Sequence, residues 1–260
     1  MHATTLALVG ATGGAGTTRT AVELAAIGAR GGRDVAVVDA SFTTQGLSEY
    51  VHGRIGTDLT TLITDEPDTA LSAATYPIAA APSDDGPNER SGRADVVPVR
   101  APFERIARAK TAEAARKLER RIDEAATAYD AVIVDTSPVA SNEAVATVTT
   151  ADRVGVVRPA TEHGRDALQR LRGRIADVGA SVDTTVAVRR EVVADAETDG
   201  TAADADLVLP PTDPNVRTAP AVADGADAYA KRVLDAYARL FDTAVDVELA
   251  ERGLFDKLRS

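Results

Sequence analysis

Short apolar runs alternate with longer helical patterns along most of the chain. Residues 6–9 and 35–38 are runs of four apolar residues, and apolar residues at helical spacing occupy much of the stretch between them. Apolar runs without alternation are typical of strands buried on both faces of a parallel sheet. The order strand, helix, strand predicts one right-handed βαβ unit at the start of the chain.

The same alternation continues downstream and predicts an α/β fold. Strands are expected at residues 96–99, 131–134, 151–159, 185–190 and 207–209, and helices at 58–74 with a break at Pro67, 103–127, 142–150, 166–178 and 227–241. Residues 82–95 are polar and rich in Pro and Gly, which is typical of a solvated loop. We predict a three-layer α-β-α fold with a mostly parallel central sheet. It forms a single domain over residues 1–241, followed by a tail at 242–260.

A glycine-rich loop connects the first predicted strand to the first predicted helix. Four of its seven residues are glycine, namely Gly10, Gly13, Gly14 and Gly16. Glycines at such a junction let backbone N–H groups face an anion, with the helix dipole behind them. The loop therefore predicts a phosphate-binding site.

Two kinds of phosphate loop fit these glycines. A Walker A loop ends in Gly-Lys-[Ser/Thr]. A dinucleotide-binding loop has spaced glycines and an acid that closes the second strand, here Asp39. A catalytic short-chain dehydrogenase would also need Tyr-x-x-x-Lys, and no tyrosine of the chain has Lys four residues on. A non-catalytic NAD(P)-binding protein stays an alternative.

The residues after the first loop glycines carry a family resemblance. Residues 12–19 read Thr12-Gly13-Gly14-Ala15-Gly16-Thr17-Thr18-Arg19 and resemble the deviant Walker A loop of the ParA/MinD family of P-loop ATPases. The resemblance extends to about residue 241. It implies a P-loop NTPase-like sheet, ATP and Mg²⁺ as cofactors, and a role in placing chromosomes, division sites or other cellular complexes. It also implies that residues 13–19 bind the nucleotide.

Two strand-end acids complete the expected metal site. The run at 131–134 ends on Asp135, which a parallel sheet would deliver to its carboxyl edge, where ligands bind. The following residues resemble the Walker B and switch II segment of the family. The resemblance implies a Mg²⁺ site made of Thr18, Asp39 and Asp135. Asp39 has a purely structural alternative, in which it caps the loop that follows its strand.

The chain departs from the family pattern where the chemistry is most sensitive. Thr12 and Thr17 stand in place of both loop lysines, and Ser41 stands in place of the acid that helps to position the attacking water. Because these groups serve the transition state, we expect ATP hydrolysis to be slow or absent, and we assign no catalytic residue. The alternative is an ATPase rescued by Arg19 or by a partner protein.

The resemblance also indicates which residues would lie beside the adenine base of the nucleotide. The family has an asparagine that reads adenine where this chain has Arg189, and Pro210 lies in the proline loop that flanks the base. We expect the chain to dimerise or to pair with an active member of the family.

Charge and composition narrow the range of partners and sites that we expect for this chain. A formal net charge of −11 and a pI near 4.8 argue against general affinity for nucleic acid. The chain has no cysteine for disulfides or thiolate metal sites, and its three histidines are scattered. No apolar run is long enough to span a membrane and no leader pattern is seen, so we expect a cytoplasmic protein.

Two basic segments interrupt this acidity. Residues 100–121 carry an excess of Arg and Lys, which predicts either a solvated helix face with i,i+4 ion pairs or a docking face for an acidic partner, a membrane or DNA. Residues 249–260 resemble the short C-terminal membrane-targeting helix of MinD proteins. A peripheral membrane location through this tail is one interpretation, and a terminal helix that packs on the domain or frays is the other.

Scarce lysine and abundant acids are also typical of proteins from a high-salt cytoplasm. Acidic side chains repel one another less when salt screens them, so we predict that the melting temperature rises between low and molar salt. Thermal unfolding over a series of KCl concentrations measures this. An unchanged or falling melting temperature would contradict a halophilic origin.

Overall fold

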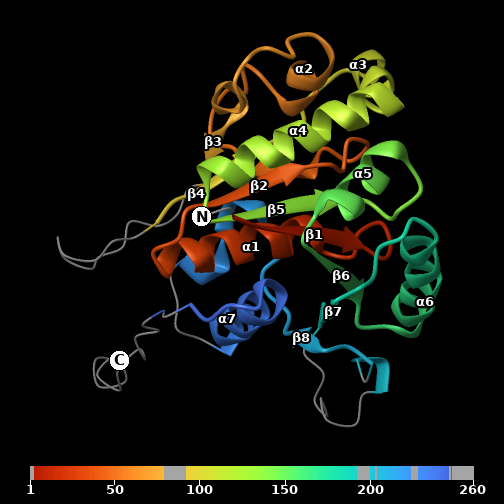
Figure 1. Ribbon diagram of the computed structural model, residues 1–260. Helices are drawn as coiled ribbons and strands as arrows, with labels where there is room; N and C mark the ends of the chain where they lie inside the picture. Colours follow the sequence, from red (N-terminus) through yellow and green to blue (C-terminus); the bar gives the residue numbers. More distant parts are fainter. Residues whose placement is uncertain are drawn as a thin grey trace, which may run out of the picture.

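The computed structural model describes residues 3–78, 92–191, 200–202, 204–223, 228–245 and 247. Within these residues, eight strands form one sheet in the order β3-β4-β2-β5-β1-β6-β7-β8 (Figure 1). Every pair is parallel except β3 with β4. The strands are β1 (Thr4–Gly10), β2 (Val35–Asp39), β3 (Tyr76–Pro77), β4 (Ala94–Val97), β5 (Ala131–Thr136), β6 (Arg153–Pro159), β7 (Thr184–Val188) and β8 (Leu207–Leu209).

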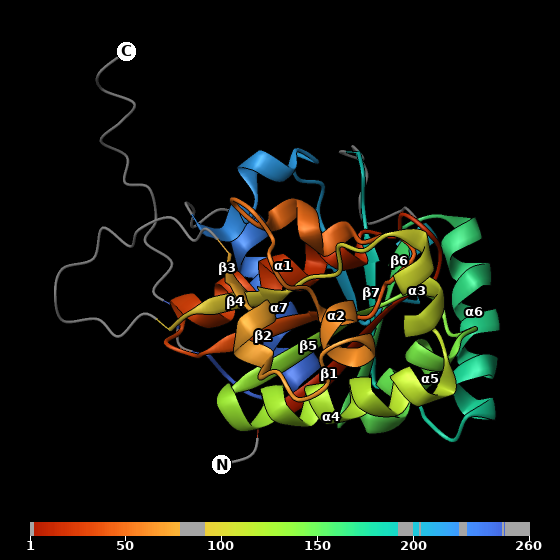
Figure 2. The same ribbon diagram turned by 90° about the horizontal axis from the view of Figure 1, so that it is seen from above.

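Helices cover both faces of the sheet and produce the predicted three-layer α-β-α architecture (Figures 1 and 2). The α-helices are α1 (Thr17–Arg30), α2 (Leu59–Thr64), α3 (Phe103–Ala109), α4 (Ala112–Ala128), α5 (Asn142–Thr150), α6 (Glu162–Asp177) and α7 (Ala228–Phe241). Short 3₁₀ helices are η1 (Gly46–Tyr50), η2 (Leu71–Ala74), η3 (Gly200–Ala202), η4 (Val216–Thr218) and η5 (Ala221–Ala223). No α-helix of the described part is long and apolar enough to cross a membrane.

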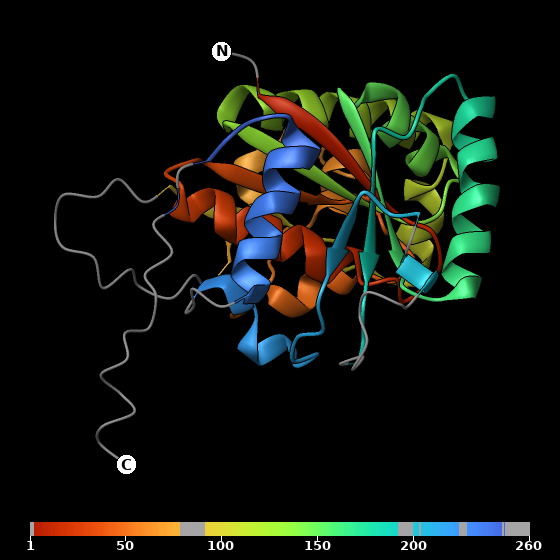
Figure 3. The same ribbon diagram turned by 90° about the horizontal axis from the view of Figure 1, so that it is seen from below.

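Alternate residues of each central strand feed opposite cores, as the pleat requires. Leu6 and Leu8 of β1 pack with α1 and α7, which lie side by side on one face (Figure 3). Ala7 and Val9 pack with α5 and α6 on the other face. A third cluster joins β2, β4 and β5 to α2, α3 and α4. Because both faces are buried, the strands read as unbroken apolar runs.

The strand order decides between the two kinds of phosphate loop. In the dinucleotide-binding order the first two strands of the fold are neighbours. Here β5 lies between β1 and β2 and pairs in parallel with each of them. The sheet therefore does not have the strand order of a dinucleotide-binding fold, and the NAD(P)-binding alternative is wrong on this point.

The long helix predicted over residues 103–127 is in fact two helices. α3 ends at Ala109, and α4 begins after Thr111, whose side chain accepts a hydrogen bond from the N–H of Ala114. A threonine hydroxyl at this position caps a helix start and competes with a continuous helix. Apolar periodicity spans both helices, so it does not show the break.

Two further boundaries differ from the prediction for similar reasons. α6 begins four residues earlier than predicted, because the Thr161 hydroxyl accepts from the N–H of Gly164 and caps the helix. β4 covers Ala94–Val97 rather than 96–99. Pro98 has no N–H for a sheet ladder, so the strand ends before it.

Five cations of the basic segment at 100–121 pair with acids, as the interpretation of a solvated helix face with ion pairs expects. Two of the pairs have i,i+4 spacing, one in α3 and one in α4, and the other three cations bind acids of neighbouring elements or of the next helical turn. The pairs are Arg105 with Asp58 and Asp65, Arg108 with Asp65 and Glu104, Lys110 with Glu143, Lys117 with Glu113, and Arg121 with Glu124. Most of the loop predicted at 82–95 and the tail at 249–260 lie outside the described residues.

One glycine of α1 fixes the packing of α1 against α7. A Cβ at Gly28 would lie 2.8 Å from the ring of Tyr237 and 2.9 Å from Val35. Tyr237 is fully buried and stacks on Phe241, so it has little room to move. Only a glycine lets the two helices approach this closely.

We predict that Gly28→Ala destabilises the protein by about 1–3 kcal/mol, because the added methyl group overpacks this contact. Urea unfolding measures the change. Gly173→Ala in α6 is the matched control, since a Cβ there meets nothing within 4 Å. Alanine should stabilise that exposed helix by about 0.5–1 kcal/mol. Equal effects of the two substitutions would contradict the packing argument.

Candidate functional site

The site lies where β1, β5 and β2 end at one edge of the sheet. Parallel pairing places Asp39 of β2 directly beside Asp135 of β5. The other neighbour of β5 is β1, which leads into the glycine loop. Residues from three distant parts of the chain are therefore gathered at the carboxyl edge, where open α/β sheets bind ligands.

The backbone of the loop has the conformation that its glycines predict. Gly14 and Gly16 have φ angles of 70° and 90°, a region that other residues rarely adopt. Gly16 also precedes the first turn of α1, and no side chain caps that turn. The first N–H groups of α1 therefore have no intrahelical partner and can serve an anion.

Thr18 and Asp135 meet beneath this loop. The Thr18 hydroxyl donates a hydrogen bond of 2.6 Å to Oδ2 of Asp135. The carboxylate is fully buried, and its second oxygen, Oδ1, has no hydrogen-bond partner among the described residues. A buried, half-satisfied carboxylate is costly unless a ligand completes it. Hydroxyl and carboxylate oxygens are ligands that Mg²⁺ accepts, so the two side chains fit a hydrated Mg²⁺.

Asp39 lies behind this pair and takes the capping role that was its structural alternative. Its carboxylate accepts from the backbone N–H groups of Ser41, at 2.9 Å, and Val99, at 3.3 Å. Ser41 in turn is hydrogen-bonded to Ser137 through their hydroxyls. Ser41 and Asp135 line a cavity of about 340 Å³ at this edge, and Asp39 is not among the described residues that line it.

Burial perturbs both acids in the same direction. Desolvation, helped by the nearby charge of Asp135, raises the pKa of Asp39 to about 8 despite the backbone hydrogen bonds it accepts. Desolvation also raises the pKa of Asp135 to about 6, opposed by the hydrogen bond from Thr18. Because two neighbouring carboxylates are buried at one edge of the sheet, binding of a proton or of a cation to them is favoured.

Two adjoining cavities share the glycine loop. The first, of about 340 Å³, is the loop cavity; it is lined by residues 12–19 together with Gly10, Ser41, Thr44, Gly46 and residues 135–138. The second, of about 400 Å³, is the β7–β8 cavity; it is lined by residues 14–16, Arg19, Thr20, Tyr50, residues 188–190, Leu209, Pro210, Thr212, Pro214 and Tyr229. Every residue that the sequence assigned to nucleotide binding lines at least one of the two.

Arg19 lines both cavities, and its guanidinium is held between α1 and the segment that follows β8. It forms a 2.6 Å ion pair with the buried Glu23 and donates to the carbonyls of Asp213 and Asn215. Glu23 also accepts from the N–H groups of Ala221 and Val222. These contacts tie the segment after β8 to α1.

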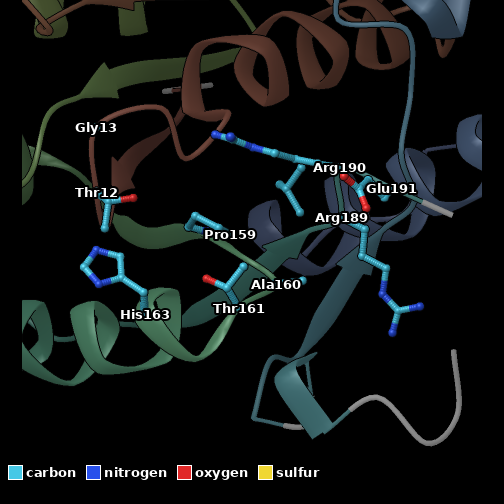
Figure 4. A pocket seen from close by; sticks show the side chains of 10 residues that line it. Thr12, Gly13, Pro159, Ala160, Thr161, His163, Arg189, Arg190 and Glu191 are labelled. Carbon is cyan, nitrogen blue, oxygen red and sulfur yellow. The ribbon is translucent and has the colours of Figure 1, made fainter. Parts of the chain in front are cut away.

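A third and larger cavity, of about 520 Å³, lies on the far side of the loop and is the α6 cavity (Figure 4). Thr12, Gly13, the β6–α6 connection with His163, and the end of β7 line it. Figure 4 shows the side chain of Arg190 extending toward the glycine loop, whereas that of Arg189 points away from it. Arg190 donates to the carbonyl oxygen of Gly14 at 2.5 Å.

Sequence reasoning missed Arg190 and the two tyrosines of the β7–β8 cavity. Arg190 ends the predicted strand at 185–190, so the rule that strand ends meet at one edge could have found it. Tyr50 and Tyr229 come from η1 and from the first turn of α7. No motif marks them, because their place in the site depends on packing between remote segments.

The loop, the strand order and the buried acid together define the fold class of the P-loop NTPases, and the flanking helices agree with it. The chain belongs to the AAA_31 family of AAA domains, which matches residues 3–188. A comparison with curated protein sequences finds no match.

Solved structures show the same fold at low identity. The septum site-determining protein MinD of Pyrococcus horikoshii, complexed with Mg-ADP, has a TM-score of 0.69 and 17% identity, with 92% of this chain and 95% of that chain covered. MinD in the Aquifex aeolicus MinC:MinD cell division complex gives 0.69 and 17%, covering 96% and 100%. Cyanothece McdA in complex with ATP gives 0.65 and 16%, covering 96% and 99%.

The two raised pKa values predict a pH-dependent stability. Asp39 and Asp135 bind protons more tightly in the folded protein than in the unfolded chain, where the Asp pKa is about 3.8. Without a bound cation, the free energy of unfolding should therefore fall as the pH rises from about 4 to about 8. Asp39→Asn should flatten this slope, because it removes one of the two acids.

Urea unfolding in EDTA across this pH range measures the slope. Asp123→Asn is the matched control, since Asp123 is exposed on α4. A slope that is unchanged in the Asp39 variant, or equally flattened in the control, would contradict the assignment.

Proposed function

We propose that the protein binds ATP and Mg²⁺ in the loop cavity and the β7–β8 cavity. The glycine loop would surround the phosphates, and Pro210 and Arg189 would flank the base. The observation that carries this proposal is the Thr18–Asp135 hydrogen bond beneath the loop, with Oδ1 of Asp135 buried and unpartnered among the described residues. Thr18 and Asp135 would hold the Mg²⁺, directly or through water, with Asp39 behind them. Bound Mg²⁺ would supply positive charge to the phosphates.

Hydrolysis is expected to be weak or absent. Thr12, Thr17 and Thr18, which line the loop cavity, are all uncharged, and Ser41 offers no carboxylate to a water. Nε of Arg19 pairs with Glu23 and Nη1 donates to two carbonyls, while Nη2 has no hydrogen-bond partner among the described residues. These contacts hold most of the guanidinium, which disfavours rescue of the reaction by Arg19. Removing such charges from phosphoryl-transfer enzymes lowers turnover by about three to five orders of magnitude.

A positioning role fits a nucleotide-binding protein that turns over slowly. The similar structures include a septum site-determining protein and a MinC:MinD cell division complex. We propose that this chain acts in spatial positioning, such as chromosome partitioning or cell division. It would dimerise or pair with an active member of its family, in the cytoplasm or at a membrane surface reached through residues 249–260. Its negative charge makes nucleic acid an improbable partner.

Thr18→Ala tests the metal-binding half of the proposal. We predict that the wild-type protein binds ATP more tightly with Mg²⁺ than with EDTA, and that Thr18→Ala loses this difference because a ligand to the metal is gone. Isothermal titration calorimetry measures the affinities, and a phosphate-release assay should show little or no turnover in either protein. Thr149→Ala, at an exposed position of α5, is the matched control.

Three results would contradict the proposal. Binding of NAD(P) in preference to ATP would refute the nucleotide. An ATP affinity that ignores Mg²⁺ in the wild type would refute the metal site. Sustained turnover at about 1 s⁻¹ or more would refute the weak hydrolysis, since that rate is usual for active phosphoryl-transfer enzymes.

A further inference from the structure

Arg190 contacts the glycine loop from outside the loop's own sequence. It follows β7, is exposed, and donates from Nη2 to the carbonyl oxygen of Gly14 at 2.5 Å. Figure 4 shows the side chain reaching across from the end of β7 to the loop. The contact joins residues that are 176 positions apart in the chain.

The position of the contact suits an anion-binding loop. When backbone N–H groups turn toward an anion, some carbonyl groups must turn away and need partners of their own. Gly14, with a φ of 70°, presents its carbonyl to Arg190. The Nη2 donor of the guanidinium thereby holds the loop backbone at Gly14, and the rest of the guanidinium lies close to Gly14 as well.

Arg190 also lies close to the border between the loop cavity and the β7–β8 cavity. It lines the β7–β8 cavity together with Gly14, Ala15 and Gly16, and these three residues line the loop cavity as well. A nucleotide that occupies both cavities must place its phosphates at this shared border. Arg190 also lines the α6 cavity, together with Glu191, the nearest acid along the chain.

The other cations near the loop are placed elsewhere. Arg19 is paired with Glu23, and the side chain of Arg189 points away from the loop. Arg170 and Arg174 of α6 flank Thr12 from outside and line neither the loop cavity nor the β7–β8 cavity. Arg190 thus combines a hydrogen bond to the loop backbone with a place in the lining of the β7–β8 cavity.

We propose that Arg190 binds the phosphate groups of the nucleotide and supplies from β7 the positive charge that the loop threonines lack. This inference rests on the proposed function and names a phosphate-binding residue for the same site. A guanidinium suits the task, because its planar fork can bind a phosphate oxygen while another donor keeps the Gly14 carbonyl.

Three substitutions separate the charge from the hydrogen bond. Arg190→Ala removes both, Arg190→Gln keeps an N–H donor for Gly14 without the charge, and Arg190→Lys keeps the charge. Calorimetry with Mg-ATP at one fixed salt concentration should show about tenfold to a hundredfold weaker binding for Ala and Gln, the usual effect of losing a hydrogen bond to a charged group. Lys should retain most of the affinity. Arg172→Ala, at an exposed position of α6, is the matched control and should bind as the wild type does.

The outcomes distinguish this inference from the proposal on which it rests. If the wild type binds no ATP, the proposed function fails and the inference fails with it. If the wild type binds ATP and Arg190→Ala binds it equally well, only the inference fails. Wild-type affinity in Arg190→Gln would also overturn it, because the arginine would then act by holding the loop. Equal melting temperatures of the variants show that a loss of affinity does not come from unfolding.

Discussion

The insertion of β5 between β1 and β2 is the constraint on which the rest of the site depends. Parallel pairing on both sides of β5 brings its terminal carboxylate level with Asp39 and leaves it beneath the loop that follows β1. This arrangement brings the Thr18 hydroxyl to Asp135, although the two residues are 117 positions apart. In a sheet with β1 and β2 as neighbours, the glycine loop would remain but Asp135 would not lie beneath it.

The charge of the site follows from that geometry. Two carboxylates are desolvated at one edge, while the loop above them has no lysine. The charge of such a site is balanced by protons on the carboxylates, by a bound cation or by a side chain outside the loop. The loop offers backbone N–H groups and hydroxyl oxygens, and Asp135 offers a carboxylate, so the described site binds through backbone and oxygen groups.

Local sequence patterns predicted most of the fold, because buried parallel strands leave unbroken apolar runs and each run led to a helix. The glycine loop and the strand-end acids were also visible, since each is encoded within a few neighbouring residues. The break at Thr111 was not, because a single capping hydroxyl decides it while the periodicity continues. Tyr50, Tyr229 and the pairing of Arg19 with Glu23 depend on contacts between remote segments, which no single stretch of sequence records.

α1 has a second attachment that bears on how the site can move. Its first turn begins at the phosphate-binding loop, while Arg19, Glu23 and Arg30 hold the backbone of residues 213–222 through hydrogen bonds. That segment continues from the wall of the β7–β8 cavity at Thr212 and Pro214. The glycine loop of the loop cavity and one wall of the β7–β8 cavity are thus both attached to α1. A displacement of α1 would therefore change the walls of the loop cavity and of the β7–β8 cavity together.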